Sequence, residues 1–199
     1  MTRRPLTLAL LLALGACGPL VQIGGNAEPP ASLLTLRAAS LGAPAVAIDP
    51  ARSLVIAQPS VPGTLQTLRL PVTTSDTEVQ YLKGATWVEQ PSKLFQRLLV
   101  DTVGASGGVL VLSERQSDVA AARKLTGQLL EFGLDARGAP QVSVRYDALL
   151  SGSDGNPVAA RRFEATRPVA GEDPATIGAA INAAANQVAG EVAAWVTGS

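Results

Sequence analysis

The chain has 199 residues, with 16 basic and 16 acidic side chains, no histidine and a single cysteine. This length fits one domain that can bury its own core. One thiol excludes a disulfide scaffold, and the lack of histidine excludes Ser-His-Asp triads, Cys-His dyads and histidine-containing zinc sites. Formal neutrality argues against a nucleic-acid binder, which normally has a basic face. The remaining classes are a scaffold or binding protein, or an enzyme limited to carboxylate, serine or lysine chemistry.

The first 16 residues are predicted to be a secretory signal peptide. Two arginines precede an apolar run from Leu6 to Ala13, which is too short to cross a bilayer as a helix. The run ends in Leu14-Gly15-Ala16-Cys17, which resembles the bacterial lipobox. In a lipobox the cysteine becomes the first mature residue and carries a diacylglycerol and an N-acyl chain such as palmitate. We therefore expect Cys17 to be lipidated; the alternative is an ordinary signal peptide followed by an unmodified or buried thiol.

Lipidation of Cys17 has consequences for location and charge. A thioether-linked lipid leaves no thiol to oxidise, and several acyl chains together give a durable membrane anchor. The next residue is Gly18, not the aspartate that retains many lipoproteins at the inner membrane, so the expected location is the periplasmic face of the outer membrane. Residues 17–32 have the glycine, proline and small polar composition of a flexible tether, and a single domain is expected over 33–199. Loss of the signal peptide leaves 14 basic and 16 acidic side chains.

The first half of the domain is predicted to contain short strands and one helix. Apolar or extended runs predict strands at 33–36, 53–57, 67–70 and 78–83, and Pro71 is expected to break the chain.

The helix is predicted to start at Pro91, after a cap at Glu89 or Gln90, because proline is favoured at the first helical position. Apolar residues recur at helical spacing up to Val103, Gly104 is expected to end the helix, and a strand is predicted at 108–112.

The second half is predicted to be a meander of strands and a closing helix. Three antiparallel strands fill residues 124–166, with turns at 135–138 and 153–156, and Ser143, Arg145 and Asp147 fall on one polar face. Asp173 caps a helix that begins at Pro174 and continues to Trp195. The alanine-rich surface of this helix indicates close packing, either on the sheet or on a second copy of the chain. We predict an α+β (mixed α/β) fold: a two-layer domain with a mixed, largely antiparallel sheet and two main helices packed on one face.

No candidate catalytic motif in the sequence has the structural context that its chemistry requires. Gly104-Ala105-Ser106-Gly107-Gly108 matches the pattern G-x-S-x-G, but it follows a helix and precedes a strand, the reverse of a nucleophile elbow. Lys93 follows Ser92 but falls on the solvated side of its helix, where its ammonium group is not activated. The only adjacent carboxylates, Glu172 and Asp173, are placed for helix capping. No phosphate-binding loop is present, so any ATP use must belong to a partner. We expect no enzyme activity, no metal site and no cofactor other than the lipid on Cys17.

Two large amphipathic side chains, Tyr81 and Trp87, precede the first helix. Such residues either complete a core or mark an interface. A partner-binding surface is predicted from Tyr81, Trp87, Glu89 and Arg97, and a core position remains the alternative for the two aromatic residues.

The order of these features resembles that of the ABC-type transport auxiliary lipoproteins, also called PqiC-like lipoproteins. The matching features are the lipobox, the segments Leu33–Leu36 and Val55–Pro59, the Tyr81…Trp87-Val88-Glu89-Gln90-Pro91 entry to a helix, and the closing helix that ends in tryptophan. One departure is that the family usually has an arginine shortly before the tyrosine, whereas Arg69 lies further away in this chain.

The resemblance implies a non-catalytic lipoprotein that assists a transport system of the cell envelope. Its partners would be an MCE-domain periplasmic protein with its permease and ATPase, and its cargo phospholipid or another hydrophobic molecule. An alternative function is an envelope-structural or assembly lipoprotein that binds peptidoglycan or another outer-membrane component. Oligomerisation of the chain is left open.

Overall fold

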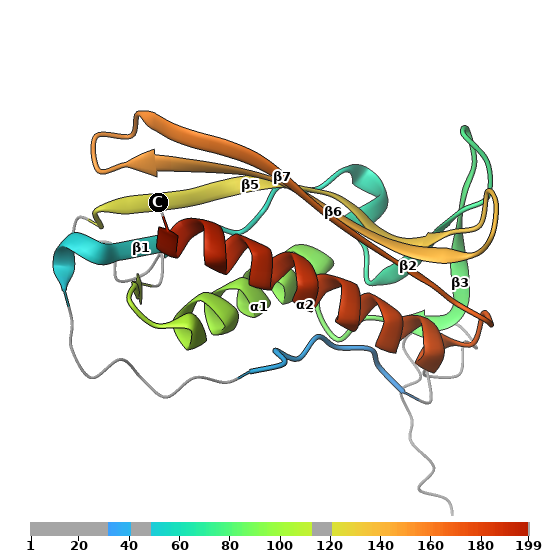
Figure 1. Ribbon diagram of the computed structural model, residues 1–199. Coiled ribbons are helices and arrows are strands. Elements are labelled where there is room, and N and C mark those ends of the chain that lie inside the picture. The colour runs from blue at the N-terminus through green and yellow to red at the C-terminus, as the bar shows by residue number, and fades with distance from the viewer. Residues whose placement is uncertain (1–31, 41–48, 113–120, 199) are drawn as a thin grey trace, which may run out of the picture.

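The computed structural model describes residues 32–40, 49–112 and 121–198. The predicted signal peptide and Cys17 lie outside the described residues. The elements in chain order are η1 (Pro50–Arg52), β1 (Ser53–Ile56), η2 (Gly63–Leu65), β2 (Arg69–Thr73), β3 (Val79–Thr86), α1 (Pro91–Ser106), β4 (Leu110–Leu112), β5 (Arg123–Asp135), β6 (Gln141–Gly152), β7 (Pro157–Pro168) and α2 (Pro174–Gly198). Seven strands form one sheet, and α1 and α2 cover one of its faces (Figure 1).

Strand β5 is the centre of the sheet because it pairs with three other strands, β1, β2 and β6. Along one edge β6 runs antiparallel to β5, and β7 runs antiparallel to β6. Along the other edge the start of β5 pairs in parallel with β1, and its end pairs in parallel with β2. Strand β4 extends the sheet beyond β1, and β3 extends it beyond β2. The predicted α+β fold, with a mixed and largely antiparallel sheet, is confirmed.

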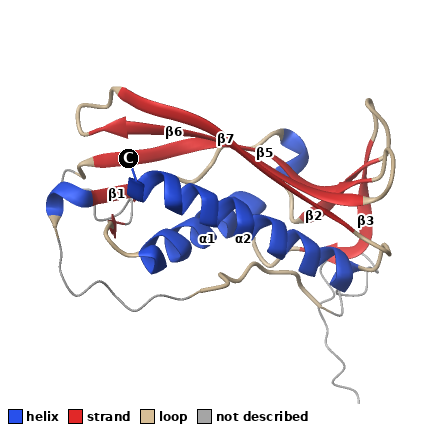
Figure 2. Ribbon diagram, in the orientation of Figure 1, coloured by secondary structure: helices blue, strands red, loops and turns tan. Residues whose placement is uncertain are grey.

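The core lies between the sheet and the two helices, as Figure 2 shows. Alternate residues of the long strands point toward the helices; for example, Phe132 on β5 lies opposite Val144 on β6, and Tyr146 lies opposite Phe163 on β7. All four side chains are buried. This period of two is the one that the sequence showed, so the face of each strand was predictable.

Helix α2 packs against α1 and against β6 and β7. Asp173 caps it as predicted, because the Asp173 Oδ1 atom accepts a hydrogen bond of 2.9 Å from the Thr176 backbone N–H. Its buried face combines bulky residues with small ones, among them Ala184, Ala185 and Ala189, which are fully buried within the described chain. These alanines therefore serve packing inside the domain.

Residues 33–39 form an extended segment, here called the strap, instead of the predicted sheet strand. The strap crosses the outer side of the helices (Figure 1), and among the described residues its strand-like pairing is a bridge between Leu34 and Trp87. Its apolar residues Leu34, Leu36 and Ala38 still alternate inward. Asparagine side chains of α2 take the place of a neighbouring strand: the backbone N–H of Arg37 donates to the Oδ1 atom of Asn182 at 2.9 Å. The Asn186 amide bonds both the carbonyl of Arg37 and the N–H of Ala39.

Two expected chain breaks fall inside regular elements. Pro71 lies within β2, at a bulge in which residues 69–71 of β2 face the longer stretch 81–86 of β3. Gly84, with φ at 76°, provides the left-handed backbone conformation in this bulge and allows β3 to continue to Thr86. Gly104 does not end α1; the helix continues to Ser106, and Gly107, with φ at 73°, is the first residue that leaves the helical conformation. The adjacent glycines in this run made the end of the helix ambiguous in the sequence.

Replacement of Gly127 by alanine tests the close contact between β5 and β6. A Cβ atom at Gly127 would lie 2.3 Å from the Asp147 carbonyl oxygen and 2.6 Å from the Tyr146 ring. We expect Gly127→Ala to lower the free energy of unfolding by roughly 1–3 kcal/mol, because backbone and a buried ring must shift. Gly190→Ala on α2 is the matched control, since a Cβ there meets no atom within 4 Å; it should raise stability by about 0.5–1 kcal/mol. Urea unfolding followed by circular dichroism measures both, and a Gly127→Ala protein as stable as the parent would contradict the packing.

Candidate functional site

The four residues predicted to bind a partner are divided by the structure between core and surface. Trp87 is completely buried, and its ring centroid lies 5.2 Å from that of Phe132. The side chain occupies the core position that the sequence left open as an alternative. A residue without exposed surface cannot contact a partner in this fold, so Trp87 supports the surface from beneath.

Glu89 and Arg97 are brought together by the first turns of α1. Their carboxylate and guanidinium groups form an ion pair of 2.5 Å, and 56% of the Arg97 side chain stays exposed. Solvent screening makes such a pair worth little to stability. The exposed guanidinium keeps donors that can reach an acidic partner.

Tyr81 is paired with a cation that comes from the neighbouring strand. The Arg69 guanidinium lies 4.3 Å from the centre of the Tyr81 ring, and the Tyr81 hydroxyl donates to the Thr64 carbonyl oxygen at 3.4 Å. Strand pairing thus places Arg69 beside the tyrosine although the two residues are 12 positions apart in the sequence. Arg69, which lies further from Tyr81 along the chain than the arginine of the family pattern, is therefore close to Tyr81 in space.

The connection over residues 63–69 joins the two pairs. The Trp87 backbone N–H donates to the Leu68 carbonyl at 2.7 Å, and the Gln90 side chain donates to the Gln66 carbonyl at 3.4 Å. The strap lies on the other side of Trp87, where the Val88 N–H donates to the Leu34 carbonyl at 2.9 Å. Three chain segments therefore lie side by side at the end of the domain where the strap begins.

Apolar side chains that the sequence did not predict to be part of this site are exposed at the same end. Leu33, Leu68 and Val88 are 51%, 42% and 46% exposed, respectively. The sequence signal for Val88 was the alternation of side-chain direction along the segment around Trp87. That alternation predicts an exposed Val88 only once Trp87 is known to point inward. The residues that we call the strap-end surface are Leu33, Leu68, Arg69, Tyr81, Val88, Glu89, Lys93 and Arg97.

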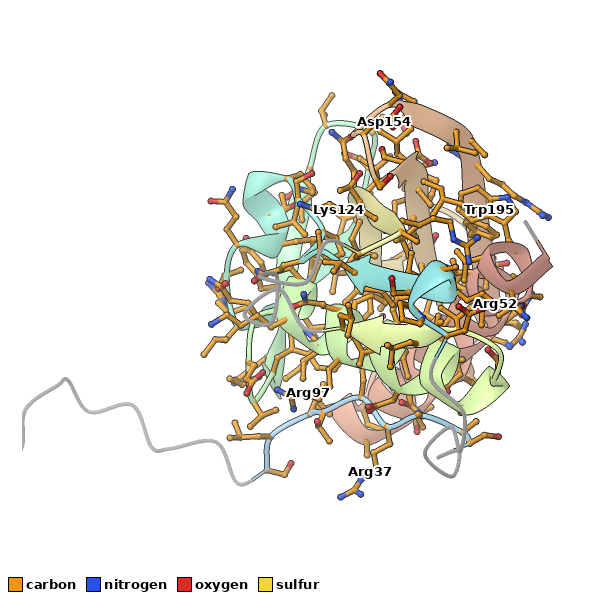
Figure 3. All side chains as sticks on the ribbon, turned by 90° about the vertical axis from the view of Figure 1, so that its left-hand side faces the viewer. Arg37, Arg52, Arg97, Lys124, Asp154 and Trp195 are labelled. Carbon is orange, nitrogen blue, oxygen red and sulfur yellow. The ribbon has the colours of Figure 1, made fainter. Side chains whose placement is uncertain are left out.

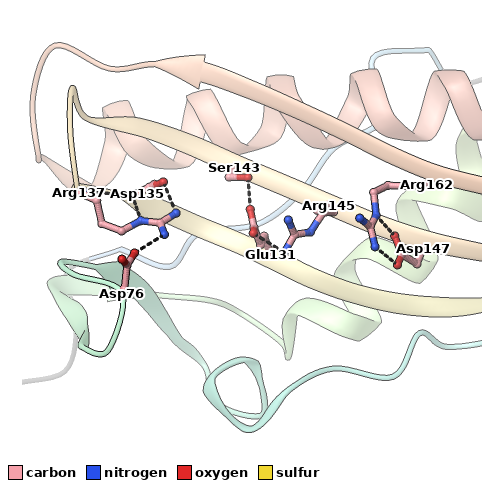
Figure 4. A network of polar contacts seen from close by, with 8 residues as sticks. All are labelled: Asp76, Glu131, Asp135, Arg137, Ser143, Arg145, Asp147 and Arg162. Atoms are coloured by element: carbon pink, nitrogen blue, oxygen red, sulfur yellow. Dashed lines mark hydrogen bonds and ion pairs between the residues drawn. The ribbon is translucent and has the colours of Figure 1, made fainter.

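The polar face of the sheet is the second candidate, and Figure 4 shows that acidic and basic side chains on it are paired with one another. Arg162 donates to both carboxylate oxygens of Asp147 at 2.7 Å. Glu131 accepts from Arg145 and from the Ser143 hydroxyl, as the predicted polar face implied.

A further cluster closes the end of this face. Arg137 donates to Asp135 and, across the sheet, to Asp76 at 3.0 Å. The Arg137 hydrogen bond lowers the pKa of Asp135, and the Arg162 hydrogen bonds lower that of Asp147. Both carboxylates are ionised at neutral pH, the opposite of what a general acid requires. The hollow beside Asp135 measures about 180 Å³, below the size of typical ligand pockets.

The serines considered as nucleophiles are engaged in local structure. The Ser106 hydroxyl donates to the Val103 carbonyl at 2.7 Å, at the end of a helix. Ser92 is buried and accepts from the Gln58 amide at 2.8 Å, whereas the neighbouring Lys93 is exposed. Within residues 32–40, 49–112 and 121–198, no group of three or more acidic, histidine or cysteine side chains could hold a metal ion. In the same part of the chain, no helix combines the length and apolarity needed to cross a bilayer.

Comparison with known proteins identifies the family. The model of the ABC-type transport auxiliary lipoprotein component matches residues 34–193. Among solved structures, a Xanthomonas campestris protein of the family DUF330 shares 26% identity with a TM-score of 0.68, over 84% of this chain and 95% of its own.

Two further solved structures share the fold. An uncharacterised protein has 16% identity and a TM-score of 0.65 over 83% of this chain and 99% of its own. A hypothetical protein from Chlamydia trachomatis has 9% identity and a TM-score of 0.50 over 74% of this chain and 98% of its own. No curated protein is significantly similar to this chain in sequence.

Substitutions should separate the core residue of this site from the surface pair. We expect Trp87→Ala to cost about 3–5 kcal/mol of unfolding free energy, because it empties a buried volume beside Phe132. Glu89→Gln and Arg97→Gln should each change it by less than about 1 kcal/mol, since the pair is exposed. Thermal unfolding of the three variants provides the measurement. Equal losses in all three would show that the ion pair is structural.

Acid should selectively weaken the contact between Asp147 and Arg162. Because the folded-state pKa of Asp147 is lowered, its contribution to stability is present above the unfolded pKa of about 3.9 and is lost as pH falls through the lower folded value. Asp147→Asn should therefore be slightly less stable than the parent at pH 7, and the difference should vanish toward pH 2. Urea midpoints across this range test the expectation; a difference independent of pH would assign the effect to packing.

Proposed function

Because this chain belongs to the ABC-type transport auxiliary lipoprotein family, whose model matches most of its length, we propose that it is a lipid-anchored accessory subunit of an envelope transport system. The observation that carries the proposal is the coincidence of this match with a lipobox-like Cys17 directly upstream of the matched residues. The domain contributes binding and positioning, and its partners supply ATP hydrolysis and the membrane channel.

The anchor in this proposal is a diacylglycerol and an N-acyl chain on Cys17, which hold the domain at the periplasmic face of the outer membrane. Acyl chains supply about 0.8 kcal/mol per buried CH₂ group, and more than one chain is needed for stable attachment. The anchor explains why an envelope protein has one cysteine and no second thiol to pair with it.

The partner in this proposal is a periplasmic MCE-domain protein that works with a permease and an ATPase to move phospholipid or another hydrophobic molecule between the membranes. The described residues support a binding role in two ways. Several of their carboxylates form ion pairs with arginines, and Asp173 caps a helix. Their exposed apolar residues offer contact area for another molecule.

Replacement of Cys17 tests the anchor and the partnership together. We expect Cys17→Ala to move the protein from the outer-membrane fraction to the soluble periplasm, and to abolish the mass increment of lipidation on the N-terminal peptide. The wild-type protein should co-purify with an MCE-domain protein after crosslinking in cells, and deletion of the gene should alter the lipid composition of the outer membrane. Co-purification with peptidoglycan or an outer-membrane assembly complex instead, with unchanged envelope lipids, would support the structural alternative.

A further inference from the structure

We propose that the strap-end surface lies against the phospholipid bilayer, so that the lipid anchor and the domain contact the membrane at the same end. The proposal rests on the lipid anchor of the proposed function. It assigns the predicted partner residues Glu89 and Arg97 to a membrane partner and leaves the other faces of the domain for protein contacts.

The strap begins only a short distance along the chain from the predicted lipid anchor. The chain enters the domain at Leu33, which is itself part of the strap-end surface, and Cys17 lies 16 residues earlier. Whatever its conformation, such a segment spans at most about 58 Å. An anchored chain therefore keeps this surface near lipid at high effective concentration, and even a weak affinity suffices for contact.

Contacts with α2 hold the strap in place, so the chain from Cys17 reaches the domain at a defined end. Asn182 and Asn186, one turn apart on α2, bond the backbone of residues 37–39. Leu34 lies so close to Gly178 that an added Cβ would be 2.7 Å from its Cδ2 atom. These contacts fasten the strap along the helix layer, and its beginning lies beside the end of β3 (Figure 1), where the Leu34 N–H donates to the Thr86 carbonyl.

Strand geometry gives the apolar residues of this surface a common direction. Leu34 and Trp87 form a parallel bridge, and both side chains point inward. Their neighbours Leu33 and Val88 therefore point outward on the same side, because successive residues alternate. Arg69 joins this side, since it pairs with Thr86, two residues before Val88.

Three exposed cations, Arg69, Lys93 and Arg97, belong to the strap-end surface. Lys93 and Arg97 lie four residues apart on α1 and so share one helix face, while the exposed Arg37 points outward from the strap (Figure 3). Glu89 is the one carboxylate of the strap-end surface, and it is paired with Arg97. A surface that combines exposed apolar side chains with cations suits a membrane interface, where the apolar groups enter the headgroup region and the cations meet anionic phosphates.

Single-cysteine probes on the lipidated full-length protein test this orientation. Once lipidated, Cys17 has no free thiol, so Val88→Cys can be labelled with an environment-sensitive fluorophore after reconstitution in vesicles of phosphatidylethanolamine and phosphatidylglycerol. Val158→Cys is the matched control: it is 64% exposed and lies near the β6–β7 turn, at the opposite end of the sheet (Figure 1). Nitroxide-labelled lipid should quench the Val88→Cys probe at least about threefold more strongly than the control probe.

A charge reversal at Lys93 tests whether the cations of the strap-end surface contribute to membrane contact. Lys93→Glu should reduce quenching of the Val88→Cys probe by about twofold or more, while Lys124→Glu on the polar face of the sheet should leave it unchanged. Equal quenching at Val88 and Val158, or protection of the Val88 probe only after an MCE-domain protein is added, would overturn the proposal. The vesicles contain no transporter, so failed co-purification in cells would leave this result intact, and mass spectrometry of Cys17 verifies the anchor separately.

Discussion

The pairing of β5 on both of its edges is the constraint on which the rest of the domain depends. One edge takes β6 over the full length of the strand, while the other takes β1 at its start and β2 at its end. Two glycines make this possible. Gly127 sits against the backbone of β6 and the Tyr146 ring, and Gly133 sits against the Pro71 carbonyl, with no room for a Cβ at either position. Larger residues there would separate the strands that the core requires.

This arrangement explains how two short parallel strands are combined with a long antiparallel meander. The chain leaves β1, runs beside β5 with a bridge between Ser60 and Gln128, forms η2, and returns to β5 as β2. That path brings Leu68 beside Trp87 and Arg69 over Tyr81. The strap-end surface is therefore a product of the β1–β2 connection. The two aromatic residues of this region have different roles: Trp87 fills the core, and Tyr81 packs against the Arg69 guanidinium.

The strap adds a functional consequence to this packing. It is amphipathic with the period of a strand, yet asparagine amides on a helix satisfy part of its backbone in place of a neighbouring strand. Amides can do so because each offers both a donor and an acceptor. In the proposed anchored protein, the strap connects the tether to a fixed end of the domain, and this end then lies toward the membrane. On the sheet's polar face, by contrast, Arg137, Arg145 and Arg162 are each paired with a carboxylate of the same face.

The sequence by itself determined the elements whose signals are local. The period of two in β6, the proline and aspartate at the start of α2, and the glycine turns required no knowledge of distant residues, and together they predicted an α+β fold with helices on one face. Tertiary structure alone decided which residues of the predicted site are accessible. Trp87 and Val88 are adjacent in the chain, and only the bridge to Leu34 directs one into the core and the other to the surface. The same holds for Arg69 and Tyr81, and for the strap, because pairing partners are chosen by packing between segments far apart in the sequence, which local periodicity does not encode.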